Sequence, residues 1–220
     1  MKKVISLVLA SILALALIAC GAKEAPQATQ DTPAPAPTEA AAPAETPAAS
    51  VESAAAEAQQ TAEGGILVAY FSATGTTKGV AEKLASAVDG DLYEIVPTEP
   101  YSDAALNWND WESRSTKEQN DKNVRPGIAS ETLDLSGYTT IYVGFPIWWG
   151  EEPRIMDTFV ESYDFSGKTM IPFCTSGGSG IGNSGRNMEQ LTSGATWLDG
   201  SRFGGSVSED ELRSWADGLQ

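Results

Sequence analysis

The residues best suited to chemistry are four hydroxyl side chains and one glycine, in the sequence Ser72-Ala73-Thr74-Gly75-Thr76-Thr77. An apolar, strand-like run precedes them and a stretch with helical periodicity follows. The first N–H groups of a helix have no partner inside the helix, and the helix dipole is positive at that end. With hydroxyl donors added, such a terminus binds a phosphate without a basic side chain. Helix capping is the alternative, but one cap needs only one hydroxyl. The loop therefore favours a phosphate site.

Two more loops follow apolar, strand-like runs. One reads Pro146-Ile147-Trp148-Trp149-Gly150, and the other reads Thr175-Ser176-Gly177-Gly178-Ser179-Gly180. In an open parallel sheet, ligands bind beyond the carboxyl ends of the strands, so all three loops should converge there. The first of these loops offers aromatic faces, and the second offers backbone that can approach the edge of a flat ring. We expect a site for a planar ring that carries a phosphate tail.

Short apolar runs alternate with helical stripes from residue 65 onward, which predicts an α/β domain with a parallel sheet. The expected strands are Ile66–Phe71, Leu92–Val96, Thr140–Phe145 and Thr169–Cys174. The expected helices are Lys78–Val88, one that includes Asn187–Leu191, and Glu209–Ala216.

Composition excludes several classes of protein. The chain has no histidine, which removes Ser-His-Asp and Cys-His catalysis and the commonest metal ligand, so no metal site is expected. The formal net charge of −16 argues against nucleic acid as a partner. The two cysteines suggest neither a disulfide framework nor a zinc site. Cys174 ends an apolar run with no cationic neighbour evident, so we expect a small buried hydrophobe and no catalytic residue.

The N-terminal segment has the pattern of a secretory signal. Lys2 and Lys3 precede an apolar run over 4–19 that is short for a membrane span, and Cys20 follows it directly. The end of the run resembles the lipobox of bacterial lipoproteins, which implies lipidation at Cys20 and a place in the cell envelope outside the cytoplasm. A plain signal peptide and an uncleaved anchor helix are the alternatives. We expect a signal peptide over 1–19, a disordered Ala/Pro-rich tether over 20–64 and a folded domain over 65–220.

The stretch from Ile66 to Gly218 resembles the flavodoxin family, in particular bacterial members with a Trp-Trp-Gly loop. The resemblance rests on the three loops, each after a strand and in the right order. It implies a doubly wound three-layer sandwich with a five-stranded parallel sheet in order 2-1-3-4-5, FMN as cofactor, and electron transfer to a redox partner or a quinone-like substrate. The cofactor-binding residues it implies are Ser72, Thr74, Gly75, Thr76, Thr77, Pro146, Ile147, Trp148, Trp149, Gly150, Thr175, Ser176, Gly177, Gly178 and Gly180.

The segment 100–128 is unlike a minimal flavodoxin, because it contains Trp108 and Trp111 among many polar residues. Two interpretations stay open: a surface helix whose tryptophans pack on the sheet, and a helix with a loop beside the flavin site that shape a substrate pocket. Two other functions stay open for the chain as a whole: a surface lipoprotein that binds a phosphorylated ligand without redox turnover, and a cofactor-free interaction module.

Overall fold

The structure is a computed structural model, and it describes residues 64–219. The predicted signal peptide, the lipidation at Cys20 and the tether fall outside the described residues, so they stay predictions.

Six strands form one parallel sheet in the order β2-β1-β3-β4-β5, with β6 also paired to β4. The strands are β1 (Gly65–Tyr70), β2 (Asp91–Glu94), β3 (Tyr138–Pro146), β4 (Thr169–Thr175), β5 (Thr196–Trp197) and β6 (Ser201–Phe203). The expected order 2-1-3-4-5 is confirmed. The two short strands β5 and β6 share the fifth position, because residues 198–200 interrupt the pairing with β4.

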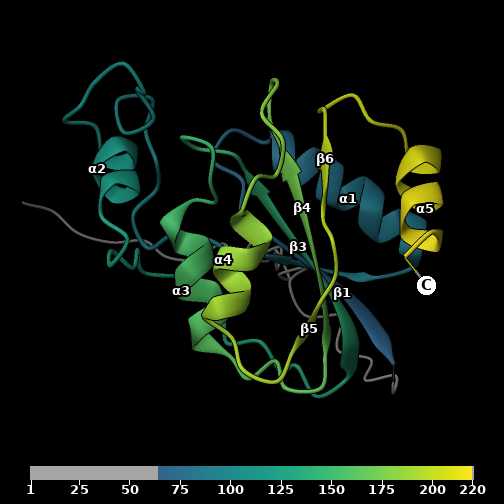
Figure 1. The fold of residues 1–220 in the computed structure, drawn as a ribbon. Helices are drawn as coiled ribbons and strands as arrows, with labels where there is room; N and C mark the ends of the chain where they lie inside the picture. Colours follow the sequence, from purple (N-terminus) through teal and green to yellow (C-terminus); the bar gives the residue numbers. More distant parts are fainter. Residues whose placement is uncertain (1–63, 220) are drawn as a thin grey trace, which may run out of the picture. The chain divides into compact units, whose positions relative to one another are not determined.

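Helices cover both faces of the sheet, as a doubly wound three-layer fold requires (Figure 1). One face carries α1 (Thr76–Val88) and α5 (Glu209–Asp217), which contact each other, and the other carries α3 (Arg154–Ser162) and α4 (Ser184–Gln190). Within residues 64–219, no helix is long and apolar enough to cross a membrane.

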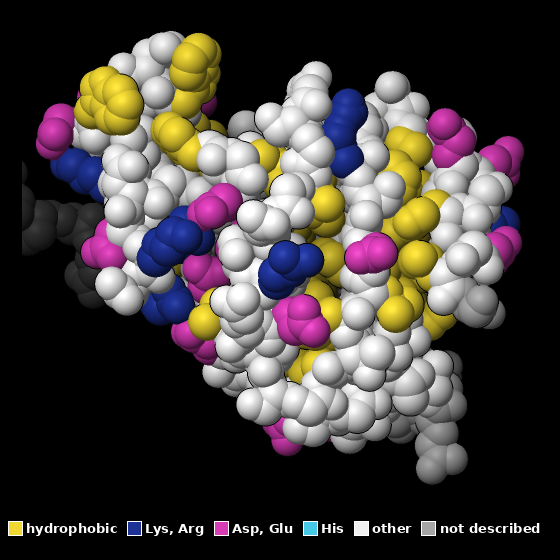
Figure 2. All heavy atoms as spheres, viewed as in Figure 1, with side chains coloured by type: hydrophobic (Ala, Val, Ile, Leu, Met, Phe, Trp, Pro, Cys, Tyr) yellow, Lys and Arg dark blue, Asp and Glu magenta, His cyan; other side chains and the backbone are white. Residues whose placement is uncertain are grey.

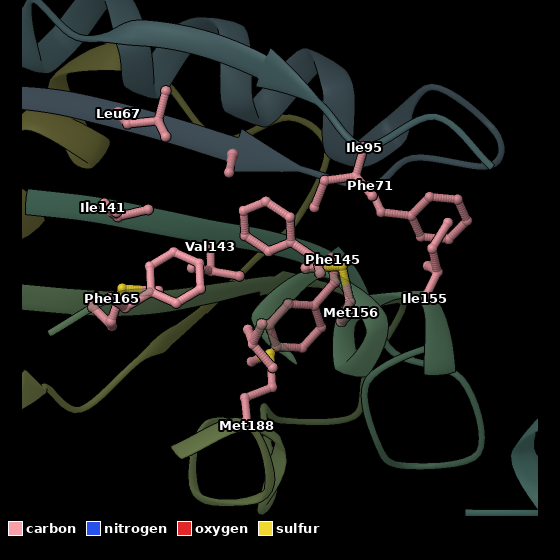
Figure 3. Close-up of a cluster of buried hydrophobic side chains, with 14 of the residues drawn as sticks. Leu67, Phe71, Ile95, Ile141, Val143, Phe145, Ile155, Met156, Phe165 and Met188 are labelled. Carbon is pink, nitrogen blue, oxygen red and sulfur yellow. The ribbon is translucent and has the colours of Figure 1, made fainter. Parts of the chain in front are cut away.

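Burial on both faces explains why the central strands β1, β3 and β4 each contain a continuous apolar run. Successive residues of β1 alternate between two cores: Leu67 and Ala69 face the α3–α4 side, and Val68 and Tyr70 face the α1–α5 side. Figure 3 shows the first of these cores, in which phenylalanine and methionine side chains fill the space between the sheet and the helices. The two cores fix the sheet, and with it the loops at its carboxyl edge.

The structure corrects two details of the predicted elements. Helix α3 was not predicted, although its spacing of buried residues at 155, 156, 159 and 160 is helical. Strand β2 ends at Glu94 and does not continue to Val96. The reason is local: the Val96 N–H donates to the hydroxyl of Ser130 at 2.7 Å, and its carbonyl accepts from the Ala129 N–H, so the chain has left the sheet there.

The segment between β2 and β3 includes α2 (Arg114–Asn120) and extends away from the sheet, on the same side as α3 (Figure 1). We call residues 98–127 the arm. A backbone hydrogen bond from Thr98 N to Gly127 O, at 2.8 Å, closes its base. Trp108 and Trp111 are 73% and 77% exposed, and Figure 2 shows hydrophobic atoms at the surface of this part of the molecule. The interpretation in which these tryptophans pack on the sheet is therefore wrong.

Candidate functional site

The loop after β1 presents an open helix N-terminus. Gly75 stands at the N-cap of α1 with φ +87°, and no side chain caps the helix. The hydroxyl of Ser72 accepts from the Gly75 N–H at 3.1 Å, which shapes the loop before the helix starts. Thr74 and Thr76 are exposed beside it. The first turn of a 13-residue helix therefore offers its N–H groups and two hydroxyls to an anion, as the phosphate prediction requires.

Thr77 and Thr175 lie inside the protein. They are 1% and 3% exposed, and their hydroxyl oxygens are 2.8 Å apart. One hydroxyl donates to the other, so only one of the two protons is left for another acceptor. The pair ties the loop after β1 to the end of β4. Direct contact of either threonine with a cofactor stays a prediction.

The aromatic loop is a tight turn between Trp148 and Glu151. Trp148 N donates to Glu151 O at 2.9 Å, and Glu151 N donates to Trp148 O at 3.1 Å. The two residues between them have positive φ, +50° at Trp149 and +84° at Gly150. A positive φ is uncommon for a bulky residue and marks a backbone that the surroundings hold in place. Trp149 is 44% exposed, so the turn presents an indole to solvent.

Trp148 points the other way and anchors the turn. Its ring packs edge-on against Phe71 and Tyr101, with centroid distances of 5.6 and 5.0 Å. The preceding residues Pro146 and Ile147 are half-buried, and Ile147 N donates to Thr175 O at 3.0 Å. Of the two tryptophans, Trp149 is the one free to stack on a planar ligand.

The loop after β4 leaves its backbone accessible. The Ser176 hydroxyl donates to the carbonyl of Ser179 and closes the loop on itself. Gly177, Gly178 and Gly180 are exposed, and no atom lies within 4 Å of the place where a side chain would begin. The residues at the three loops thus fit a phosphate at α1, a ring face at Trp149 and a ring edge along the glycines.

Cys174 is fully buried at the end of β4, and its burial raises the pKa of its thiol to about 12. The thiol stays protonated at neutral pH, which confirms the expectation of a small buried hydrophobe.

A buried polar cluster behind the aromatic loop was missed from the sequence. Arg154 is 3% exposed and donates to Glu151 at 2.8 Å and to Asp157 at 3.4 Å, and the first of these bonds holds the pKa of Glu151 below its usual value. Burial raises the pKa of Asp157 and of Glu152, which accepts from Asn187 at 3.1 Å. Charges in the order Glu-Glu-Pro-Arg suggest a solvated surface, so only the tertiary structure reveals this cluster.

Fold and site together define a doubly wound α/β protein with a candidate ligand site at the carboxyl edge of its sheet, at the switch point of the strand order. The family described as Flavodoxin matches residues 65–219. The chain belongs to the flavodoxin family.

Solved structures of similar proteins agree with this family. A protein of Bacteroides eggerthii, provisionally named a flavoprotein, is 46% identical with a TM-score of 0.67, and the match covers 70% of this chain and 97% of that one. A similarly named protein of Bacteroides uniformis is 47% identical with a TM-score of 0.67, covering 70% and 98%. A Lactobacillus acidophilus flavoprotein in complex with FMN is 24% identical with a TM-score of 0.52, covering 70% and 99%. No curated protein matches the chain.

Proposed function

We propose that residues 65–219 bind FMN at the carboxyl edge of the sheet and serve as a redox protein. One observation carries the proposal: three loops meet there, and they offer an uncapped helix N-terminus, an exposed indole and an accessible glycine backbone. Membership of the flavodoxin family supports it, as does the FMN complex of the Lactobacillus relative. When bound, FMN supplies reversible electron transfer.

The residues of this chain bind and orient the cofactor. Thr74, Thr76 and the first N–H groups of α1 hold the phosphate, whose charge the helix dipole stabilises. Trp149 covers one face of the ring, and the backbone of 177–180 borders its edge. Electrons pass to a redox partner protein or to a quinone-like substrate.

Reconstitution tests this function. The purified chain is mixed with FMN, freed of unbound flavin and photoreduced under anaerobic conditions with EDTA as the electron donor. We expect a yellow protein whose visible flavin band bleaches and returns when a quinone or an oxidised redox protein is added. Binding of FMN without reversible bleaching would favour the non-redox ligand-binding alternative. Absence of FMN binding would favour the cofactor-free interaction module.

The protein is also a lipid-anchored component of the bacterial cell envelope in this proposal. Its support is the sequence alone: Cys20 follows directly on a short apolar run with a basic start. The anchor would leave the flavin domain outside the cytoplasm, where its partner must supply or accept the electrons.

A further inference from the structure

We propose that Gln119, which lies in the arm and outside all three loops, is a positioning residue that fixes the orientation of Trp149 against the flavin. The inference rests on the proposed function, because it concerns the same site.

Gln119 donates to the first residue of the aromatic turn and to the residue that directly follows the turn. Its side-chain Nε2 donates to the carbonyl of Trp148 at 2.9 Å and to the carbonyl of Glu152 at 3.3 Å. An amide nitrogen has two protons, so one side chain can serve both carbonyls. Gln119 is only 9% exposed, and water therefore competes little for these bonds.

Further contacts fix Gln119 relative to the turn. The guanidinium nitrogen Nη2 of Arg154 donates to the backbone carbonyl of Gln119 at 3.4 Å and to the carboxylate of Glu151 at 2.8 Å. Tyr101, also in the arm, packs against the ring of Trp148. The arm thus contacts both the ring and the carbonyl of Trp148. Trp149 follows directly and is exposed.

The turn needs such restraint because Trp149 has φ +50°, which a tryptophan adopts only where its surroundings enforce it. Without the amide donors, the carbonyls of Trp148 and Glu152 would lose their bonds from the arm. The turn could then relax, and the indole of Trp149 would leave the position that suits a stacked ring. Stacking would weaken although Trp149 itself is intact.

The test compares Gln119→Met with the wild-type chain in titrations with riboflavin and FMN. Methionine keeps the length of the side chain and removes the donors. Gln190→Met makes the same chemical change at an exposed position in α4 and is the matched control. Thermal unfolding monitors folding, and the residual fluorescence of the bound flavin reports stacking, because a stacked indole quenches flavin emission.

We expect Gln119→Met to bind both ligands about threefold to tenfold more weakly, the effect of one hydrogen bond. The loss should be equal for riboflavin and FMN, since Gln119 contacts the turn and not the phosphate loop. The bound flavin should also fluoresce more strongly than in wild type. Gln190→Met should match wild type in both respects.

If wild type binds and quenches flavin and Gln119→Met does the same, the inference is overturned while the proposed function stands. A loss of thermal stability with unchanged binding and fluorescence would show a merely structural residue and overturn it too. If wild type binds no flavin, the proposed function fails and the inference fails with it. Should Gln119→Met not fold, Gln119→Asn takes its place: it keeps the amide but is one methylene too short for both carbonyls, and the same outcomes decide.

Discussion

The hydroxyl oxygens of Thr77 and Thr175 lie 2.8 Å apart in the protein interior, where the first turn of α1 meets the end of β4. This bond connects the predicted phosphate loop with the predicted ring-edge loop. Two loops that are almost a hundred residues apart in the sequence therefore keep one geometry.

Replacing Thr77 by valine removes this bond with little change in volume. The hydroxyl of Thr175 then stays buried without a partner, so we expect the free energy of unfolding in urea to fall by about 1–2 kcal/mol. The double variant Thr77→Val/Thr175→Val leaves no orphaned hydroxyl and should be destabilised less than the sum of the two single variants. Additive effects would show that the pair contributes nothing as a pair.

Alanine variants of the two tryptophans in the aromatic turn should have different effects on flavin binding and on stability. Trp149→Ala removes an exposed indole, so flavin binding should weaken about tenfold or more while stability changes little. Trp148→Ala removes contacts with Phe71 and Tyr101 and should cost about 2–4 kcal/mol of unfolding free energy. Flavin titration and urea unfolding of both variants provide the measurement. Equal stability losses would contradict the division between anchor and ring face.

Much of the fold was predictable because its signals are local. The runs that became β1, β3 and β4 are largely apolar, and the chemistry-bearing loops follow them directly. The fifth strand could not be located from the sequence. Strands β5 and β6 are two and three residues long, which is too short to show the alternating pattern of a strand. Helix α3 begins directly after Pro153 and has charged residues among its apolar positions. The helical pattern of these nine residues is therefore hard to recognise in the sequence.

The candidate site was only partly predictable, because several of its features depend on contacts distant in sequence. Nothing local distinguishes Trp148 from Trp149; the difference comes from Tyr101 in the arm and from a turn with positive φ. The same holds for Gln119, whose amide meets carbonyls about thirty residues later. Loop composition therefore predicts which segments form the site, and packing decides what each residue does in it.

The pH dependence of stability should reveal the buried Glu152. Burial raises its pKa above the ordinary value of 4.5, so the unfolded chain releases this proton first as pH rises. Wild type therefore loses stability from this group as pH rises from about 4 through the folded-state pKa. A glutamine side chain cannot ionise, so the stability of Glu152→Gln relative to wild type should grow from pH 4 to pH 8 in urea unfolding experiments.

Glu161 provides a control, because its effect on stability should change with pH in the opposite direction. Its hydrogen bond from Arg125 lowers its pKa, so the stability that it contributes is lost as pH falls. Glu161→Gln should differ from wild type most at neutral pH and least under acid conditions. A stability difference between Glu152→Gln and wild type that is constant over this range would rule out a raised pKa at Glu152.

The anchor is tested by replacing Cys20 with serine in the full chain. If Cys20 is lipidated, the variant should move from the membrane fraction to the soluble fraction, since the apolar run alone is short for a membrane span. Immunoblots of both fractions give the result, with Cys174→Ser as the control that keeps the N-terminal sequence. A Cys20→Ser variant that stays with the membrane would point to an uncleaved helix.

The most direct test of an FMN site at α1 is a titration of wild type and Thr76→Ala with FMN and with riboflavin, followed by flavin fluorescence. Thr76 is exposed at the first turn of α1 and is expected to donate to the phosphate, which riboflavin lacks. Loss of one donor to a charged oxygen costs about 1.5–3 kcal/mol, so FMN affinity should fall roughly tenfold to a hundredfold. Riboflavin affinity should be nearly unchanged. Equal losses for both ligands, or no flavin binding by wild type, would contradict the account.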